Sequence, residues 1–509
     1  MDHLTVKSLI HLAAAGLVAC CSAVADVRPH PIFSDHAVLQ QGAEVPVWGT
    51  ARDGEQISVV FQDQKVTTVA AAGKWMVRLS NLKSGGPFVM TVQGDNRVEI
   101  RDLLVGEVWL CGGQSNMEWA LSKSDGGAEA IAHSANPMLR MGRVPHNVRM
   151  TPQDEVAVKW EECRPETAKG FSAIPYWFGA KLQKELGVPV GIINNSFGGT
   201  TIQSWMSSEV LKKGPWPQDK WSDLVLAKAE YDRNFEKIRP LKEKYDADKA
   251  DALARKLPVP PQPPGIPSEF KGPTTLWNGE VAPLLPYRIR GVAWYQGESN
   301  AYVKVADPYQ QLLPALIKEW RAGFQQPDLP FLIFQIARNR KWQTDPDEKS
   351  GIAELQEAQL KTALSTPKTS LIVTTDMGGP DVHYTGKEII GERATNAALA
   401  LVYGRNSDTS GPIFKQMEIR GSKAIVHFDH ATGGLLAKDG PLTGFVIAGK
   451  DGRFHFADAV IDGETVIVSC PKVPEPVVVR YGWADLPKVN LFNKNGLPAS
   501  TFRSDSPKP

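Results

Sequence analysis

The segment Glu107-Val-Trp-Leu-Cys-Gly-Gly-Gln-Ser-Asn-Met-Glu118 decides how the middle of this chain folds. Its apolar run, Val108–Cys111, stops at two glycines, Ser115 follows, and residues 117–121 have a helical character. A strand that turns tightly into a helix presents the serine hydroxyl at the carboxyl end of a sheet. It also places that hydroxyl at a helix N-terminus, where backbone N–H groups favour negative charge. The segment therefore predicts an α/β sheet and makes Ser115 a candidate nucleophile.

The same residues also have a structural interpretation. Ser115 and Glu118 match the capping box S-x-x-E, in which the hydroxyl only caps a helix. The nucleophile elbow G-x-S-x-G is not satisfied, because Met117 stands where its last glycine would be. Taken alone, the segment favours the cap, so a catalytic Ser115 needs partners elsewhere in the chain.

The composition is that of a globular protein. The chain has 509 residues, 42% of them hydrophobic and 22% charged, which suits two to four domains. A net charge of +1 without a basic stripe argues against binding to nucleic acid or to a membrane surface. Beyond the N-terminus, no apolar run is long enough for a transmembrane helix. Cys111, Cys163 and Cys470 form neither a disulfide framework nor a zinc pattern.

The N-terminus has the pattern of an export signal. Lys7 precedes an apolar stretch over residues 8–19, and Ala23-Val24-Ala25 is a small-x-small cleavage site. This pattern predicts a signal peptide over residues 1–25 and a periplasmic or secreted protein. Leu17-Val-Ala-Cys20 also resembles a bacterial lipobox, which would instead anchor the chain through a lipid on Cys20. Cleavage after Ala25 is the favoured interpretation.

The mature chain divides into three parts that differ in the secondary structure they predict. Residues 26–104 and 406–509 contain short β-rich runs separated by turn residues, which predicts two β-sandwich-like regions. Residues 105–405 alternate apolar strands with amphipathic helices, which predicts a flavodoxin-like α/β domain with a five-stranded parallel sheet. Residues 211–270 form a charged, helical and proline-rich insertion, which is interpreted as a solvent-exposed segment on the protein surface. The five predicted strands are Val108–Cys111, Val190–Asn194, Gly291–Tyr295, Phe331–Ile336 and Ser370–Thr375.

Polar or glycine-rich turns follow four of these strands. Ligands of open α/β sheets bind beyond the carboxyl ends of the strands, so these turns are expected to meet at one edge. Ser115 supplies a nucleophile there, and His383 supplies an imidazole that can take its proton near neutral pH. The four turns are Gly112–Asn116, Asn195–Thr201, Gln296–Asn300 and Asp376–His383.

The same turns offer donors for an oxyanion hole. Gly199 has no Cβ to obstruct a close approach to its N–H, and the Ser115 N–H is a second donor. An amide side chain such as Gln296 or Asn300 could complete the hole, and Gln114 is a further candidate for oxyanion or substrate binding.

His383 and Glu298 have alternatives that need weighing. The chain has ten histidines, but only His383 closely follows a core strand of the α/β region; His133 and His146 fall in a long connection. Glu298 could join a second carboxylate in glycoside hydrolysis. No partner for it is evident, so a supporting role is the favoured interpretation.

Together these blocks resemble the SGNH hydrolase superfamily and, more narrowly, the sialate O-acetylesterase family of carbohydrate esterases. The resemblance covers essentially the whole mature chain, and four ordered blocks make it specific where any one alone would be weak. The blocks are Gly106–Glu118, Ser196–Thr200 with Trp205, Trp294–Asn300, and Asp376–His383 with Gly391–Arg393, and the tail segment Asn490–Ala499 is also similar.

The resemblance implies hydrolysis of acetyl esters on sugar hydroxyls, without a metal or an organic cofactor. Ser115 would attack the acetyl carbonyl, His383 would accept its proton, and water would release acetate from an acetyl-enzyme. Sialic acid is the first expected substrate, and acetylated xylan or another plant hemicellulose is the alternative. One position departs from the superfamily, whose acid lies three residues before the histidine, because Pro380 stands there. Asp381 is the predicted acid, with Asp376 as the alternative, although the family can also work largely as a Ser–His pair.

Two other classes of function remain as competing hypotheses. The terminal β regions and 14 tryptophans could make the chain a non-catalytic carbohydrate-binding protein. A glycosidase that uses Glu298 is the third hypothesis.

Overall fold

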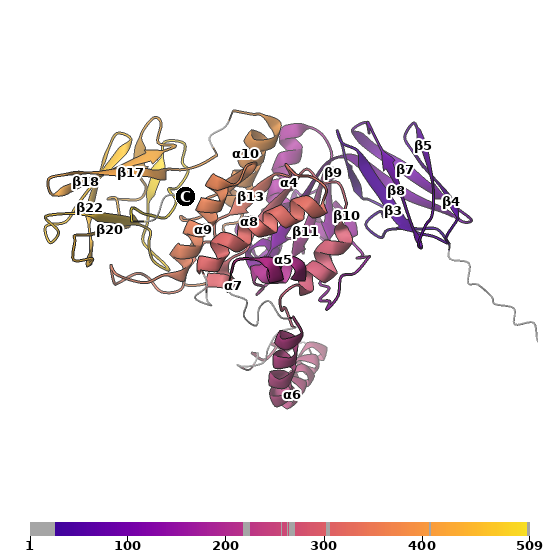
Figure 1. The fold of residues 1–509 in the computed structure, drawn as a ribbon, viewed down its shortest axis with the longest axis horizontal. Helices are drawn as coiled ribbons and strands as arrows, with labels where there is room; N and C mark the ends of the chain where they lie inside the picture. Colours follow the sequence, from indigo (N-terminus) through magenta and orange to yellow (C-terminus); the bar gives the residue numbers. More distant parts are fainter. Residues whose placement is uncertain are drawn as a thin grey trace, which may run out of the picture.

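The three parts of the chain lie in a row in the computed structural model, with the α/β domain between the two β regions (Figure 1). The structure describes residues 26–216, 224–255, 257–261, 263, 270–301, 306–406 and 409–505. The predicted signal peptide, including Cys20 and the Ala23–Ala25 cleavage site, lies outside the described residues.

The central sheet contains all five predicted strands and one more parallel strand. The five run in the spatial order 2-1-3-4-5, so the order reverses at the strand that leads to Ser115. Ligands bind at such a reversal in open α/β sheets. The strands in spatial order are β10 (Lys159–Cys163), β9 (Asn136–Arg143), β11 (Val190–Ser196), β8 (Arg97–Gly113), β12 (Gly291–Tyr295), β13 (Phe331–Phe334) and β15 (Thr369–Ile372).

The prediction of five parallel strands was therefore one short. Strand β9 pairs in parallel with β11, and β10 pairs antiparallel with β9 at the edge. β9 was missed because a charged residue, Arg140, interrupts its apolar run. That side chain is nevertheless buried, and it forms an ion pair with Asp102 at 2.9 Å.

Two pairs of helices cover the sheet. Helix α4 (Ala173–Leu186) packs with α10 (Glu388–Tyr403), and α8 (Ala306–Gly323) packs with α9 (Gly351–Ser365). Crossover connections between parallel strands are right-handed. The helices α8 and α9, which connect β12 to β13 and β13 to β15, therefore lie on one face of the sheet. The connection from β8 to β11 runs toward the other edge of the sheet, so its helix α4 lies on the opposite face.

Strand β8 joins the N-terminal β region to the α/β domain without a break. Its first half pairs antiparallel with β7 (Gly85–Gln93), and its second half is the centre of the parallel sheet. The boundary expected at residues 104 and 105 therefore falls inside one strand, and the buried residues of the two parts form one continuous core. The short β-rich runs of this region form further strands, β3 (Val45–Thr50), β4 (Gln56–Phe61), β5 (Gln64–Val69) and β6 (Lys74–Leu79).

The C-terminal β region has a core of its own. Its apolar residues, among them Phe428, Tyr481 and Phe502, form a separate cluster. Buried hydrogen bonds attach the region to the α/β domain, with 2.9 Å from the Gln335 amide to Ser500 and 2.7 Å from Thr501 to Gln356. Its larger strands are β17 (Ile413–Arg420), β18 (Lys423–Asp429), β20 (Phe445–Ala448), β22 (Asp458–Asp462), β23 (Thr465–Ser469) and β24 (Val478–Tyr481).

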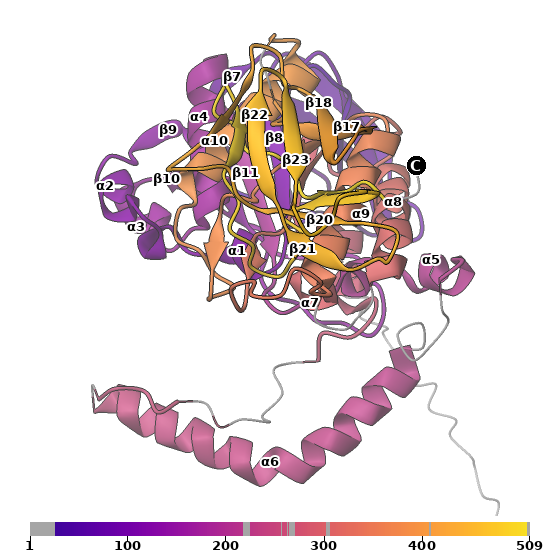
Figure 2. The same ribbon diagram turned by 90° about the vertical axis from the view of Figure 1, so that its left-hand side faces the viewer.

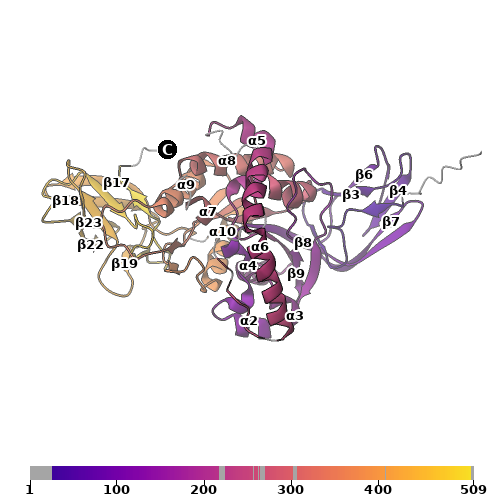
Figure 3. The ribbon, with the colours of Figure 1, turned by 90° about the horizontal axis from the view of Figure 1, so that it is seen from below.

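The insertion consists mainly of one long helix, α6 (Leu224–Ala254), which stands away from the body of the molecule (Figures 1 and 2) and crosses in front of the α/β domain when the molecule is seen from below (Figure 3). The helix predicted within this insertion is therefore present, and it contains Pro240. Figure 2 shows that α6 is bent, as expected for a helix with an internal proline. Pairs four residues apart, such as Lys244 with Asp248, support its exposed surface. No helix in the described ranges is long and apolar enough to cross a membrane.

Candidate active site

Ser115 is the first residue of helix α1 (Ser115–Glu118), directly after β8. Gly113 makes the turn possible, because its φ is +136° and a Cβ there would lie 2.0 Å from the carbonyl oxygen of Tyr295. The N-cap is Gln114, and its side chain caps nothing. The Glu118 carboxylate accepts the Gly198 N–H instead, at 2.6 Å. The capping-box interpretation was therefore wrong, and the hydroxyl of Ser115 is not consumed by the helix end.

The His383 ring lies against the residue that ends the helix carrying the serine. It stacks on Trp119 with the ring centroids 5.1 Å apart and the planes 23° apart. Its Nε2 is buried and has no hydrogen-bond partner among the described residues. Burial lowers the pKa of His383 below its usual 6.5. The imidazole is therefore neutral near physiological pH, with one ring nitrogen left to accept a proton.

Asn116 ties the serine turn to the histidine loop. Its amide nitrogen donates to the carbonyl oxygen of Val382 at 3.1 Å and to Glu298 at 2.6 Å, and its amide oxygen accepts from Lys387 at 2.6 Å. The residue after Ser115 is thus hydrogen-bonded to the residue before His383. Two turns that are far apart in the sequence meet as the strand-end argument predicted.

A carboxylate and an ammonium group lie buried on either side of this amide. Burial raises the pKa of Glu298 and lowers the pKa of Lys387 to about 7. Asn116 separates the two groups and bonds to both of them. Glu298 faces this amide, which fits a supporting role better than catalysis in glycoside hydrolysis.

The two candidate acids are placed differently. Asp381 Oδ1 accepts the backbone N–H of His383 at 2.8 Å, but it lies 3.6 Å from the ring Nδ1, which is too long for a hydrogen bond. Asp376 gives both carboxylate oxygens to Arg393, at 2.8 and 2.6 Å. Asp376 therefore links the end of β15 to helix α10, and of the two only Asp381 is beside the imidazole.

The glycine turn after β11 passes directly against the serine. A Cβ at Gly198 would lie 3.2 Å from the Cβ of Ser115. Gly199 has a φ of +70°, a conformation that side chains disfavour. Within the described part of the chain, the N–H groups of Gly199 and Ser115 donate no hydrogen bond. Both N–H groups are therefore available to a ligand.

The predicted amide side chains lie in one buried network. The Gln296 amide nitrogen donates to Asn300 at 2.8 Å, to the Thr200 carbonyl at 3.0 Å and to Gln114 at 3.3 Å. Asn300 uses its amide nitrogen to donate to Gln203 at 3.1 Å. The Gln114 oxygen also accepts two backbone N–H groups, whereas its amide nitrogen donates to no described residue. Of the three, Gln114 keeps an uncommitted donor next to Ser115.

Sequence reasoning passed over two residues near the site. His146 stacks on Phe197, with the ring centroids 3.6 Å apart, and its Nε2 lies 3.1 Å from Glu118. Lys271 donates to the carbonyl oxygen of Gly198. Had β9 been recognised, the residues after it would have pointed to His146. No local signal marks Lys271.

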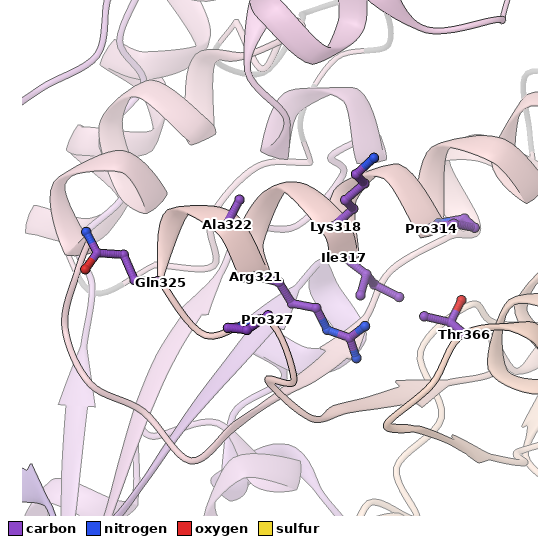
Figure 4. Close-up of a pocket in the computed structure, with 8 residues that line it drawn as sticks. All are labelled: Pro314, Ile317, Lys318, Arg321, Ala322, Gln325, Pro327 and Thr366. Carbon is purple, nitrogen blue, oxygen red and sulfur yellow. The ribbon is translucent and has the colours of Figure 1, made fainter. Parts of the chain in front are cut away.

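The hollow beside α8 in Figure 4 is not an active site. It measures about 480 Å³, and its lining contains no serine, cysteine, histidine or carboxylate side chain. Arg321 in its wall donates to the carbonyl oxygens of Leu329 and Pro367, so this cation holds loops together. Pro327 in its wall precedes β13, so the hollow lies toward the amino ends of the strands. Within the described ranges, no three His, Cys, Asp or Glu side chains gather as metal ligands.

Comparison with known proteins identifies the chain as an ester hydrolase. A family model described as carbohydrate esterase, sialic acid-specific acetylesterase, matches residues 278–400. The solved structure of a carbohydrate acetylesterase from Xanthomonas citri is 35% identical, covers 94% of this chain and 100% of its own, and superposes with a TM-score of 0.79. The sialate O-acetylesterase of Mus musculus is 27% identical over 442 residues, 78% of each chain. That of Homo sapiens is 26% identical over 435 residues, which is 78% of this chain and 75% of its own. The chain belongs to the sialate O-acetylesterase family of carbohydrate esterases.

Proposed function

We propose that this enzyme removes acetyl groups from the hydroxyls of sialic acid, with Ser115 as nucleophile and His383 as general base in a flavodoxin-like SGNH domain. The observation that carries the proposal is the Asn116 amide, which joins the serine turn to the histidine loop at the carbonyl of Val382. A binding protein would need neither a serine hydroxyl left out of helix capping nor a buried imidazole nitrogen with no partner in the described structure.

The reaction begins when Ser115 Oγ attacks the acetyl carbonyl carbon and its proton passes to His383 Nε2. Charge develops on the carbonyl oxygen, where the N–H groups of Ser115 and Gly199 stabilise it. The Gln114 amide is the third donor, because Gln296 and Asn300 are committed to their own partners. The intermediate collapses, and the sugar oxygen leaves with the proton held by His383. An acetyl group then remains on Ser115.

Water completes the cycle. His383 takes a proton from water as the water oxygen attacks the acetyl-enzyme, and acetate leaves as the Ser115 hydroxyl is restored. Stacking on Trp119 holds the imidazole plane during both half-reactions. Asp381 stabilises the imidazolium by charge alone, since its distance to the ring exceeds a hydrogen bond. An export signal over residues 1–25 would deliver this activity to glycans outside the cytoplasm.

The test compares Ser115→Ala with Ser122→Ala, an exposed serine in the short turn that follows helix α1. Acetate release is measured from O-acetylated sialic acid and from acetylated xylan, with p-nitrophenyl acetate as a general probe. We expect Ser115→Ala to lose about 10⁴-fold or more in kcat with unchanged thermal unfolding, and Ser122→Ala to match the wild type. Fluorophosphonate should label the wild type and not Ser115→Ala. Full activity of Ser115→Ala would refute the mechanism, and faster release from xylan than from sialic acid would move the substrate to plant glycans.

A further inference from the structure

We propose that Glu118 and Lys271 are positioning residues that clamp Gly198 from its two ends and so fix the Gly199 N–H as an oxyanion donor. The inference rests on the proposed function, because an oxyanion forms only if Ser115 attacks an ester. It concerns two charged side chains that touch no reacting atom in the mechanism above.

The clamp acts on both hydrogen-bonding groups of Gly198. Glu118 Oε2 accepts the Gly198 N–H at 2.6 Å, and the Lys271 ammonium donates to the Gly198 carbonyl oxygen. In a trans peptide, the carbonyl of one residue and the N–H of the next point in opposite directions. A lysine that fixes the Gly198 carbonyl therefore fixes the direction of the Gly199 N–H as well.

The turn needs such a clamp because it contains two successive glycines. Glycine has the largest backbone freedom of any residue, so a Gly-Gly turn samples many orientations of its peptide groups. Inside the turn, the Thr200 hydroxyl donates a hydrogen bond to the Phe197 carbonyl oxygen at 2.8 Å, which leaves the peptide group between Gly198 and Gly199 to be held by other residues. An oxyanion donor contributes most when it is already oriented before the reaction.

A second layer holds the two charged side chains in place. Lys271 Nζ lies 4.2 Å from the centroid of the Phe197 ring, on which His146 also stacks. His146 Nε2 is 3.1 Å from Glu118 Oε1, so the carboxylate oxygen that does not face Gly198 is also occupied. Burial acts to raise the pKa of Glu118, but His146, the Gly198 N–H and Lys271 lower it overall. The carboxylate is therefore ionised at neutral pH and accepts a strong, charge-assisted hydrogen bond from the Gly198 N–H.

The position of the clamp distinguishes it from an ordinary stabilising ion pair. Glu118 comes from the helix that begins with Ser115, and a Cβ on the glycine that it holds would lie 3.2 Å from the Cβ of that serine. The half-buried pair Lys181–Glu392 joins α4 to α10 instead and provides a matched comparison.

The experiment uses the full-length enzyme in four variants: Lys271→Met, Lys271→Arg, Glu118→Gln and the control Lys181→Met. Losing one oxyanion donor costs about 10²–10³ in kcat, so loosening one is expected to cost about 10–10² with KM little changed. Lys271→Arg should recover most of the loss, and Lys181→Met should keep wild-type kcat.

A reversible inhibitor separates positioning from general damage. Trifluoroacetone forms a hemiketal with an active-site serine and places an oxyanion in the hole, so its Ki should rise in proportion to the fall in kcat. Damage that merely reduces the active fraction would lower kcat and leave Ki unchanged. Either that result, or kcat within twofold of wild type for both Lys271→Met and Glu118→Gln, would overturn the clamp. The proposed function would survive such a result, because it depends on Ser115→Ala.

Discussion

The His383 loop and the Gly198–Gly199 turn flank the same serine and are held by the same helix, but by different chemistry. Asn116 reaches the histidine side and Glu118 reaches the glycine side. Two residues that are two positions apart on a helix point about 200° apart, since each residue turns it by about 100°. A helix of one turn can therefore hold a base on one side of Ser115 and an oxyanion donor on the other.

The two sides differ in burial and in charge. On the histidine side, Asn116 and Lys387 are 0% exposed and Glu298 is 2% exposed. On the glycine side, the side chains of His146 and Glu118 are 41% and 36% exposed. Solvent and salt screen the second set and not the first. Substitutions on the histidine side should therefore affect both folding and turnover, whereas those on the glycine side should affect mainly turnover.

Removal of the general base, His383, should give the largest fall in kcat. We expect His383→Ala to lose about 10⁴-fold in kcat, because the proposed mechanism passes the serine proton to this imidazole. His133→Ala, an exposed histidine whose ring bonds its own helix, is the control and should keep full acetate release. A kcat for His383→Ala within tenfold of wild type would show that the base lies elsewhere.

Removal of the Asn116 hydrogen bonds on the histidine side should give the next largest effect on turnover. Asn116→Ala leaves the buried Glu298 and Lys387 groups without their shared amide, and it frees the histidine loop. We expect about 3 kcal/mol lower free energy of unfolding in urea, together with about 10²-fold lower kcat. Asn136→Ala, which removes a partly buried bond to Gln183, is the matched control. An Asn116→Ala variant with normal stability and normal turnover would contradict the expectation that the histidine side supports both folding and catalysis.

Asp376→Asn should affect folding and not chemistry. The Arg393 partner is only 7% exposed, and an unpaired buried charge costs about 3–5 kcal/mol. Urea unfolding should show that loss, while kcat of the folded enzyme should stay within a few fold of wild type. A shift in the pH profile of kcat/KM would instead assign Asp376 to the histidine.

Asp381→Asn should give the smallest effect, and a pH profile is the best way to see it. The wild-type kcat/KM should rise with pH as His383 loses its proton, with a midpoint below 6.5, because burial lowers the pKa of that imidazole. The negative charge of Asp381 raises this pKa, so its removal should move the midpoint to still lower pH. We expect kcat to fall less than about tenfold, since the contact is longer than a hydrogen bond. A midpoint that moves upward would contradict the arrangement.

Much of the sheet could be predicted because its strands are continuous apolar runs. All five such runs are strands, since a strand buried on both faces has no polar side to alternate with. Strand β9 was missed because Arg140 is a charged residue in the sequence, whereas in the folded chain it is buried and paired with Asp102 and Glu162. With β9 unrecognised, nothing marked His146 as a residue that follows a strand of the sheet.

The sequence by itself determined which turns meet. Parallel strands carry their carboxyl ends to one edge, so the order of apolar runs and polar turns was enough to predict that Ser115, Gly199, Gln296 and His383 gather there. The tertiary structure decided what each group does at that edge. Only the folded chain brings Asn116 to Val382, commits Asp376 to Arg393, and sets Glu118 and Lys271 on the two ends of Gly198. Those partners are side chains far apart in the sequence, and their distances depend on how the loops pack and not on any local pattern.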